Sequence, residues 1–133
     1  MKVYFVIFVF FSLGISTCFC QNSEIEASMQ RGSEIYSDFC ASCHLEQGEG
    51  ITYTFPPLAQ SDYLMENREA SIRGVKYGQQ GEITVNGVTY NNIMAPLGLD
   101  DQEVADVMNY IMNSWGNSSE EMVTLKEVEN IQK

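Results

Sequence analysis

Cys40-Ala41-Ser42-Cys43-His44 is the stretch of sequence that decides the fold. Two cysteines separated by two residues and followed at once by a histidine form the attachment motif for c-type haem. In this motif the two thiols bond to the haem, and the histidine becomes an axial ligand of the iron. We therefore expect Cys40 and Cys43 to attach one haem c covalently, His44 to bind its iron, and the rest of the chain to house the cofactor.

Three other sites use a Cys-x-x-Cys pair: a thioredoxin-like redox couple, half of a zinc site and a plain disulfide. A redox couple is disfavoured because no βαβ pattern surrounds the motif. Zinc is disfavoured because His44 is the only histidine, and the two remaining cysteines, Cys18 and Cys20, lie in a segment that we expect to be removed. A bare disulfide is the main alternative to haem attachment.

The first 20 residues have the pattern of a secretory signal peptide. Lys2 precedes an apolar run from Val3 to Ile15, which is shorter than the roughly 20 residues that span a membrane. Cleavage after Cys20 would make Gln21 the first mature residue, so the protein is expected to be exported. The alternative is a bacterial lipoprotein, anchored to a membrane through a lipid on Cys18 or Cys20.

The chain is acidic, with 7 Lys plus Arg against 18 Asp plus Glu and a formal net charge of -11. This charge disfavours nucleic acid and anionic membranes as partners. It favours a partner with a basic docking patch, because opposite charges raise the rate of encounter. The alternative is that the acidity only keeps an exported protein in solution.

Two long amphipathic helices are predicted, one before the motif and one near the end of the chain. The first runs from Ser23 to Phe39 and carries Gly32 on its apolar face, where a glycine lets another backbone approach closely. The second runs from Asp100, which begins a capping box, to Gly116.

Shorter elements are expected between and after these helices. Ser61 opens a helical turn, Asn67 caps a helix that stops near Gly78, and Asn86-Gly87 is the turn of a hairpin over 83–90. We predict one domain over 21–117. A tail over 118–133 follows, with a capping box at Thr124 and a short helix that either packs on the domain or projects from it.

The loop Phe55-Pro56-Pro57-Leu58 follows the motif. Prolines lack an amide hydrogen, so this region offers backbone carbonyls without a local donor. Such a carbonyl can accept the Nδ1 hydrogen of His44, which fixes the tautomer and strengthens the bond from Nε2 to a metal. The alternative is that the two prolines only stiffen the loop.

The second axial position is either filled by another ligand or vacant, and no second histidine exists. Met94 is the candidate, because it lies in a loop 50 residues beyond His44, enough chain to reach the far side of the haem. The other methionines of the expected mature chain mostly lie on helical faces, where methionine usually fills the core: Met29, Met65, Met108, Met112 and Met122.

Taken together, these features resemble the small monohaem class I c-type cytochromes of the bacterial periplasm. The resemblance covers roughly 30–116 and rests on the motif and on Gly32, Tyr36, Phe39, Pro56, Leu58, Met94, Val107 and Tyr110. It implies an all-α cytochrome c fold, with crossing N- and C-terminal helices around a covalently bound haem and one short hairpin before the methionine loop. It also implies that Pro56 accepts from His44 and that Met94 is the sixth ligand.

The methionine loop also looks like that of cytochromes attached to periplasmic dehydrogenases, nitrite reductases and terminal oxidases. It departs from the commonest pattern in having Ala95 between Met94 and Pro96. A haem c subunit that relays electrons inside such a complex is therefore one alternative function, and an open-site haem enzyme or sensor is another.

The function implied is electron transfer without catalysis, by a protein expected to be a monomer that exchanges electrons between periplasmic redox partners. Methionine ligation and an apolar pocket favour ferrous iron and a positive potential. The pocket is expected to be formed by Tyr36, Phe39, Ile93, Leu97, Val107 and Ile111. Arg73 and Tyr90, with Lys76, are candidates to pair with a haem propionate, and solvated surface is the alternative for each.

Overall fold

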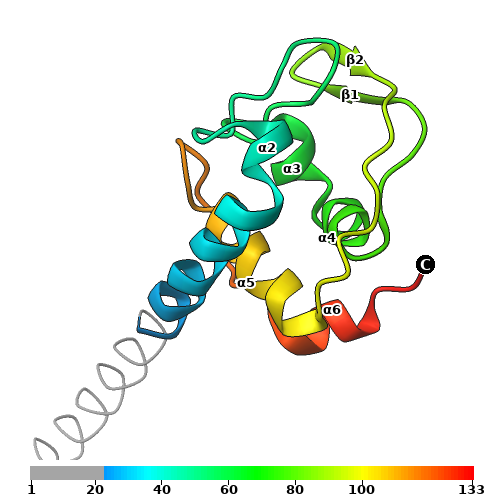
Figure 1. Cartoon of the computed structure of the whole chain (residues 1–133). Helices are drawn as coiled ribbons and strands as arrows, with labels where there is room; N and C mark the ends of the chain where they lie inside the picture. Colours follow the sequence, from blue (N-terminus) through cyan, green and yellow to red (C-terminus); the bar gives the residue numbers. More distant parts are fainter. Residues whose placement is uncertain (1–22) are drawn as a thin grey trace, which may run out of the picture.

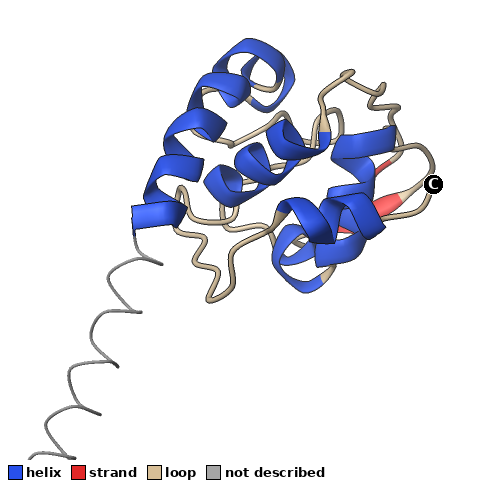
Figure 2. Ribbon diagram, turned by 90° about the horizontal axis from the view of Figure 1, so that it is seen from below, coloured by secondary structure: helices blue, strands red, loops and turns tan. Residues whose placement is uncertain are grey.

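The computed structural model describes residues 23–133, so the expected signal peptide over 1–20, with Cys18 and Cys20, lies outside the described residues. The described chain is mainly helical with one pair of short strands, which confirms the predicted fold class (Figures 1 and 2). None of the helices in this part of the chain is long and apolar enough to cross a membrane. The elements are an N-terminal helix over 23–39, α2 (Ala41–His44), α3 (Asp62–Glu66), α4 (Arg68–Tyr77), β1 (Ile83–Val85), β2 (Val88–Tyr90), α5 (Asp101–Ile111) and α6 (Leu125–Asn130).

The N-terminal helix crosses α5 at Gly32. A β-carbon at Gly32 would overlap the carbonyl oxygen of Asp106 and lie 2.8 Å from Cβ of Tyr110. A larger residue would therefore push the two helices apart, which gives the predicted glycine its structural reason. One turn along the N-terminal helix, the ring of Tyr36 lies 5.6 Å from that of Tyr110.

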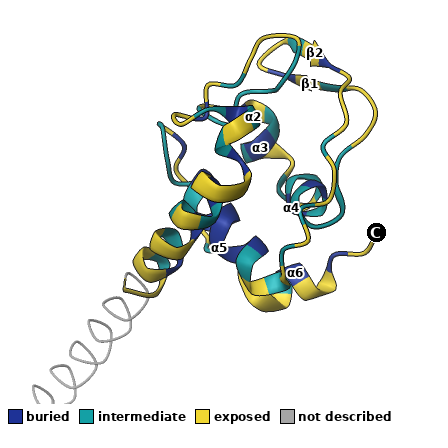
Figure 3. Cartoon of the chain, viewed as in Figure 1, coloured by how far each residue is buried: buried dark blue, intermediate teal, exposed yellow. Residues whose placement is uncertain are grey.

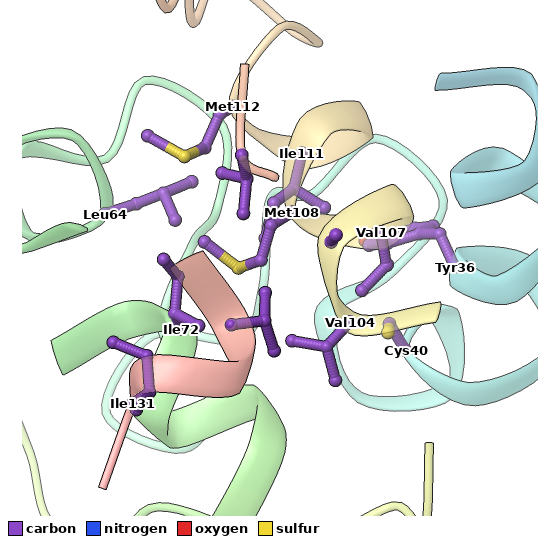
Figure 4. Packing of buried hydrophobic residues seen from close by; sticks show 13 residues of the cluster. Tyr36, Cys40, Leu64, Ile72, Val104, Val107, Met108, Ile111, Met112 and Ile131 are labelled. Atoms are coloured by element: carbon purple, nitrogen blue, oxygen red, sulfur yellow. The ribbon is translucent and has the colours of Figure 1, made fainter. Parts of the chain in front are cut away.

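α5 forms the centre of the core, and most of its residues are buried (Figure 3). Asp100 and Glu103 form the predicted capping box, in which the side chain of each residue accepts from the backbone of the other. Seven residues of α5 are buried: Val104, Ala105, Asp106, Val107, Met108, Asn109 and Ile111. Met108 lies near Ile72 of α4, whereas Val107 lies beside Tyr36 of the N-terminal helix (Figure 4).

α5 ends at Ile111, five residues before the predicted end at Gly116. Side chains beyond it bond to backbone carbonyls of the last turn, since Asn113 Nδ2 donates to Asn109 O and Ser114 Oγ to Tyr110 O. Trp115 then has a positive φ of 54° and leaves the helical stripe. Its ring packs against Tyr36 at 4.8 Å and Tyr110 at 5.4 Å.

The middle of the chain follows the prediction with one correction. Ser61 caps α3 by accepting from Leu64 N, and the hairpin turns at Asn86 and Gly87, whose φ values of 51° and 77° suit a two-residue turn. Asn67 stands before α4 but makes no side-chain cap. Its Nδ2 donates to Tyr63 O at the end of α3 instead, so the first turn of α4 lacks that support.

The C-terminal segment packs on the domain, which is one of the two arrangements expected for it. Val123, Val128 and Ile131 are buried in the same core as Ile72 of α4 and Met108 of α5 (Figure 4). Thr124 caps α6 by accepting from Glu127 N. The predicted capping box is only half present, because the carboxylate of Glu127 pairs with Arg68 of α4.

Candidate functional site

A cavity of about 360 Å³ lies between α2, α4, α5 and the hairpin. Among residues 23–133, its lining contains no Asp, Glu, Lys or Arg, although the chain as a whole is strongly acidic. Apolar lining with a few polar groups and a volume of a few hundred Å³ are typical of sites for cofactors and small molecules. Two segments supply the candidate ligands: the histidine side, residues 40–58, and the methionine side, residues 78–98.

On the histidine side, α2 brings both thiols and the imidazole to the cavity. Cys40 and Cys43 are free cysteines three positions apart, so one helical turn places them on one face. Burial, with a smaller contribution from Cys43, raises the pKa of the Cys40 thiol to about 11. The Cys40 thiol is therefore protonated at neutral pH.

His44 is buried, and its Nδ1 lies 2.9 Å from the carbonyl oxygen of Pro56. Burial lowers the pKa of His44, and the bond to Pro56 opposes that shift only in part. A neutral imidazole that donates from Nδ1 keeps the lone pair of Nε2 free for a metal. The cavity and this hydrogen bond therefore suit His44 to metal binding.

Two further contacts hold the histidine side in place. The Tyr36 hydroxyl donates at 2.6 Å to the carbonyl oxygen of Leu45, the residue that follows His44. Gly50 N donates to His44 O at 2.9 Å, and a β-carbon on Gly50 would overlap Phe55 O and lie 2.8 Å from Pro56 O. The loop thus folds back closely enough to bring the Pro56 carbonyl to the imidazole.

On the methionine side, Met94 lines the cavity from a loop that pairs with the end of α4. Gln79 and Met94 exchange two backbone hydrogen bonds, each 2.8 Å long. Gly78 has a φ of 86°, and a β-carbon there would lie 2.7 Å from Met94 O and 2.9 Å from Cδ of Pro96. The position of Met94 therefore depends on the end of α4.

Five of the six expected apolar pocket residues line the cavity: Phe39, Ile93, Leu97, Val107 and Ile111. Phe39 is 45% exposed and Ile93 is 75% exposed, so both stand at its rim. Tyr36 is not among the lining residues. It packs behind the motif against Tyr110 and Trp115, which corrects the expectation that it forms the pocket wall.

Of the three polar residues that were candidates to pair with a haem propionate, one lines the cavity and two do not. Tyr90 is buried and lines the cavity. Arg73 and Lys76 do not line it and point to the C-terminal segment instead. Arg73 donates to Gln132 O and pairs with Glu69, whereas Lys76 donates to Val128 O.

Ser71 is a cavity residue that the sequence did not single out. Its Oγ is buried and has no hydrogen-bond partner among the described residues, which is costly unless a bound group supplies one. Ala70 and Gly74 line the cavity beside it, so α4 presents three small residues to this space. These small residues were the feature of the sequence that could have indicated a cavity wall at α4, because they leave room for a bulky ligand.

The residues present fit a haem c. Two thiols and an imidazole stand on one segment and a thioether on another, and these are the attachment and axial groups that such a haem uses. The uncharged lining suits the macrocycle, and the unpaired Oγ of Ser71 can donate to a polar group on it.

Comparison with known proteins agrees with this fit. The family model for cytochrome c matches residues 29–115. Cytochrome c-552 of Thermus thermophilus is 41% identical over 92 residues, which cover 65% of this chain and 70% of that protein. The gluconate 2-dehydrogenase cytochrome c subunit of Pantoea cypripedii is 31% identical over 126 residues, 88% of this chain and 29% of that protein. The alcohol dehydrogenase (quinone) cytochrome c subunit of Gluconobacter oxydans is 28% identical over 109 residues, 75% of this chain and 21% of that protein.

Proposed function

The chain belongs to the cytochrome c family, and on that premise, which implies a covalent haem c and electron transfer, we propose that it is an electron carrier with His44 and Met94 as axial ligands. The observation that supports this most directly is that one uncharged cavity is lined both by the Cys-x-x-Cys-His turn and by the Met94 loop. The haem, when bound, supplies the one-electron ferric–ferrous couple.

On the histidine side, Cys40 and Cys43 would hold the cofactor through two thioether bonds. His44 would bind the iron through Nε2, because Nδ1 is engaged with the Pro56 carbonyl 2.9 Å away. That hydrogen bond keeps the ring from rotating and strengthens nitrogen donation to the iron. Tyr90 and Ser71 are the polar cavity groups that we assign to hydrogen bonds with the cofactor.

On the methionine side, Met94 would fill the last coordination position, so that no substrate could reach the iron. His44 and Met94 would both remain bound in the ferric and the ferrous state, which would keep the rearrangement on electron transfer small. Thioether ligation and the apolar lining disfavour the extra charge of ferric iron, so the potential should be positive. A redox titration with a midpoint well below zero would contradict this ligation.

A matched pair of variants tests the ligation. In Met94→Leu the weak red absorption band of methionine-ligated ferric haem should vanish, and the reduced protein should bind carbon monoxide. Met108→Leu is the control, because Met108 also lines the cavity but lies on α5 in the core. Loss of the band in Met108→Leu but not in Met94→Leu would overturn the assignment of Met94, and rapid carbon monoxide binding by the wild type would favour an open-site enzyme or sensor.

The partners that we propose are a donor and an acceptor redox protein of the periplasm. Electrons would pass at the rim formed by Phe39 and Ile93, which are exposed and uncharged. The chain as a whole carries a net charge of -11, which should attract partners with basic docking patches. The bimolecular reaction rate should then fall as ionic strength rises, and a rate that does not change with salt would exclude electrostatic steering.

A second candidate function is a cytochrome c subunit inside a dehydrogenase complex, which the dehydrogenase subunits among the relatives favour. The chain spans less than a third of the length of either subunit, so the assembly of those proteins does not carry over by itself. Gel filtration of the native protein separates the two functions. A free carrier elutes as a monomer, whereas a subunit copurifies with a larger enzyme.

The proposed export can be tested at the mature N-terminus. Cleavage after Cys20 leaves Gln21 first, unmodified or cyclised, and the mass of the protein shows it. A lipid on Cys18 or Cys20 would instead identify an anchored carrier.

A further inference from the structure

The segment after residue 115 lies beyond the match to the family model, yet it makes a continuous set of contacts with α4. We call residues 124–132 the C-terminal strap. Tyr77 Oη donates to Ile131 O at 3.0 Å, Lys76 Nζ to Val128 O at 2.8 Å and Arg73 Nε to Gln132 O at 3.0 Å. At the other end of α4, both Nε and Nη2 of Arg68 donate to the carboxylate of Glu127. The strap therefore contacts α4 from its first turn to its last.

α4 needs such support because its own sequence is a weak helix. It has only ten residues and no side-chain cap at Asn67, and Gly74 within it is less favourable in a helix than alanine. Isolated helices of this length are marginal in water. Most of the stability of α4 must therefore come from packing, and the buried side chains of Val128 and Ile131 supply part of it (Figure 4).

The last turn of α4 leads directly to the methionine side. Lys76 and Tyr77, which the strap holds, precede Gly78 and Gln79, which contact the Met94 loop. The Gln79–Met94 backbone pair then transmits the position of α4 to the methionine. Within residues 23–133, no hydrogen bond joins the strap to the histidine side.

We propose that the C-terminal strap is a positioning element for Met94, which keeps the end of α4 folded and so holds the methionine sulfur at the iron. This inference rests on the proposed ligation by Met94. When the strap detaches, the end of α4 frays, the Gln79–Met94 pair opens and the methionine leaves. The histidine side stays in place, because its contacts are independent of the strap.

Two tyrosine variants test the strap. Tyr77→Phe removes a hydroxyl bond from the last turn of α4 to Ile131 O, and Tyr36→Phe removes the hydroxyl bond to Leu45 O on the histidine side. In the ferric haem protein, imidazole should replace the methionine roughly threefold to tenfold faster in Tyr77→Phe than in the wild type. Tyr36→Phe should lower the stability of the whole protein but leave this rate near that of the wild type.

Amide hydrogen exchange gives a second readout that does not depend on the iron spectrum. In Tyr77→Phe the amides of Gln79 and Met94 should exchange faster, whereas those of Gly50 and Leu58, which bond to backbone carbonyls on the histidine side, should not. Equal rates in Tyr77→Phe and wild type, or equal acceleration in Tyr36→Phe, would overturn the role of the strap. Absence of the red band in the wild type would overturn the ligation by Met94, and the exchange data would still decide whether the strap holds the loop.

Discussion

The histidine side and the methionine side of the cavity are held in different ways. His44 lies one residue after Cys43, and its Nδ1 is held by Pro56 O, twelve positions away, so this hydrogen bond joins two positions of one short stretch of chain. Met94 pairs with Gln79 at the end of α4, and α4 is in turn held by Ile131 and other residues of the strap. The first is a local arrangement, and the second depends on contacts between distant parts of the chain.

This difference indicates which ligand is the easier to displace. Thioether bonds at Cys40 and Cys43 would keep the haem beside His44 even when the domain loosens. Met94 has no such tether, and the free energy that holds it is that of a few tertiary contacts. Perturbations should therefore release the methionine before the histidine.

The largest loss of unfolding free energy is expected from substitution of the glycines at which the backbone of each side packs most closely. Gly78→Ala places a methyl group 2.7 Å from Met94 O at a φ of 86°, and Gly50→Ala places one against Phe55 O at a φ of 61°. Each should cost about 2–4 kcal/mol of unfolding free energy, from left-handed strain plus overlap. Only Gly78→Ala should lose the red band of methionine-ligated haem at neutral pH.

Gly98→Ala is the control for backbone strain alone. Its φ is 77° and a β-carbon there has no neighbour within 4 Å, so the cost should be about 1 kcal/mol. Denaturant unfolding measures the free energy of unfolding, and the visible spectrum shows whether the red band is lost. Loss of the band in Gly50→Ala to the same extent as in Gly78→Ala would mean that the two sides are not independent.

The next largest loss of stability should come from Asp106, and it should affect the histidine side and the methionine side equally. Asp106 is buried and accepts from Ser28, Arg31 and Gln102, which ties the N-terminal helix to α5. Asp106→Ala should cost about 2–3 kcal/mol, because buried Ser28 loses its acceptor. Chemical denaturation measures this loss of unfolding free energy. The control is Glu34→Ala at an exposed position, which should be within about 0.5 kcal/mol of wild type. A selective loss of the red band before unfolding would contradict this shared role.

A smaller effect should appear with pH. Hydrogen bonds from Arg68 hold the pKa of Glu127 below its usual value, and for Asp106 burial raises the pKa, but hydrogen bonds from Arg31 and Ser28 outweigh it and the pKa is lowered. Both carboxylates bind protons more tightly in the unfolded chain. The stability that they contribute is therefore present above about pH 4 to 5 and is lost as pH falls through the lowered native values.

Glu127→Gln isolates the part of this effect that acts through the strap. The Arg68–Glu127 pair is partly exposed, so at neutral pH the variant should be less stable than wild type by only about 0.5–1 kcal/mol. Because wild type loses this contribution in acid, the gap should close near pH 3, which unfolding measured at both pH values can show. A gap that widens in acid would contradict the lowered pKa of Glu127.

The smallest effect concerns the contact between the two sides at the cavity mouth. Asn92 Nδ2 donates to Thr54 O at 2.8 Å, from the methionine side to the histidine side. Asn92→Ala should cost no more than about 1 kcal/mol, since the bond is exposed, but amides near Ile93 should exchange faster. Neighbouring Asn91→Ala, also exposed, is the matched control, and equal exchange in both variants would show that the bond does not hold the mouth.

The parts that sequence could predict are those encoded locally. The spacing of Cys40, Cys43 and His44 is that of one helical turn, and the structure places them on such a turn. The turn at Asn86-Gly87 and the capping box at Asp100 likewise depend on neighbouring residues, and both were confirmed. Local patterns are therefore sufficient to place the helices and the hairpin along the chain, although not to fix every helix end.

The parts that sequence could not predict depend on tertiary contacts. Helical periodicity continues through Trp115, but side-chain bonds from Asn113 and Ser114 end α5 at Ile111. Arg73 lies on a helix beside the cavity, yet its acceptor is Gln132 O, almost 60 positions away. Periodicity places a residue on a face of a helix and does not say which segment will cover that face.

The crossing at Gly32 has a consequence for how the protein folds. Arg31 and Asp106 meet across 75 positions of chain, and closing a loop of that length costs about 4 kcal/mol in entropy. During synthesis, which proceeds from the N-terminus, the N-terminal helix has no partner until α5 has been made. The face of that helix that carries Tyr36 must remain uncovered for most of translation, so the domain can close only when nearly all of its residues are available.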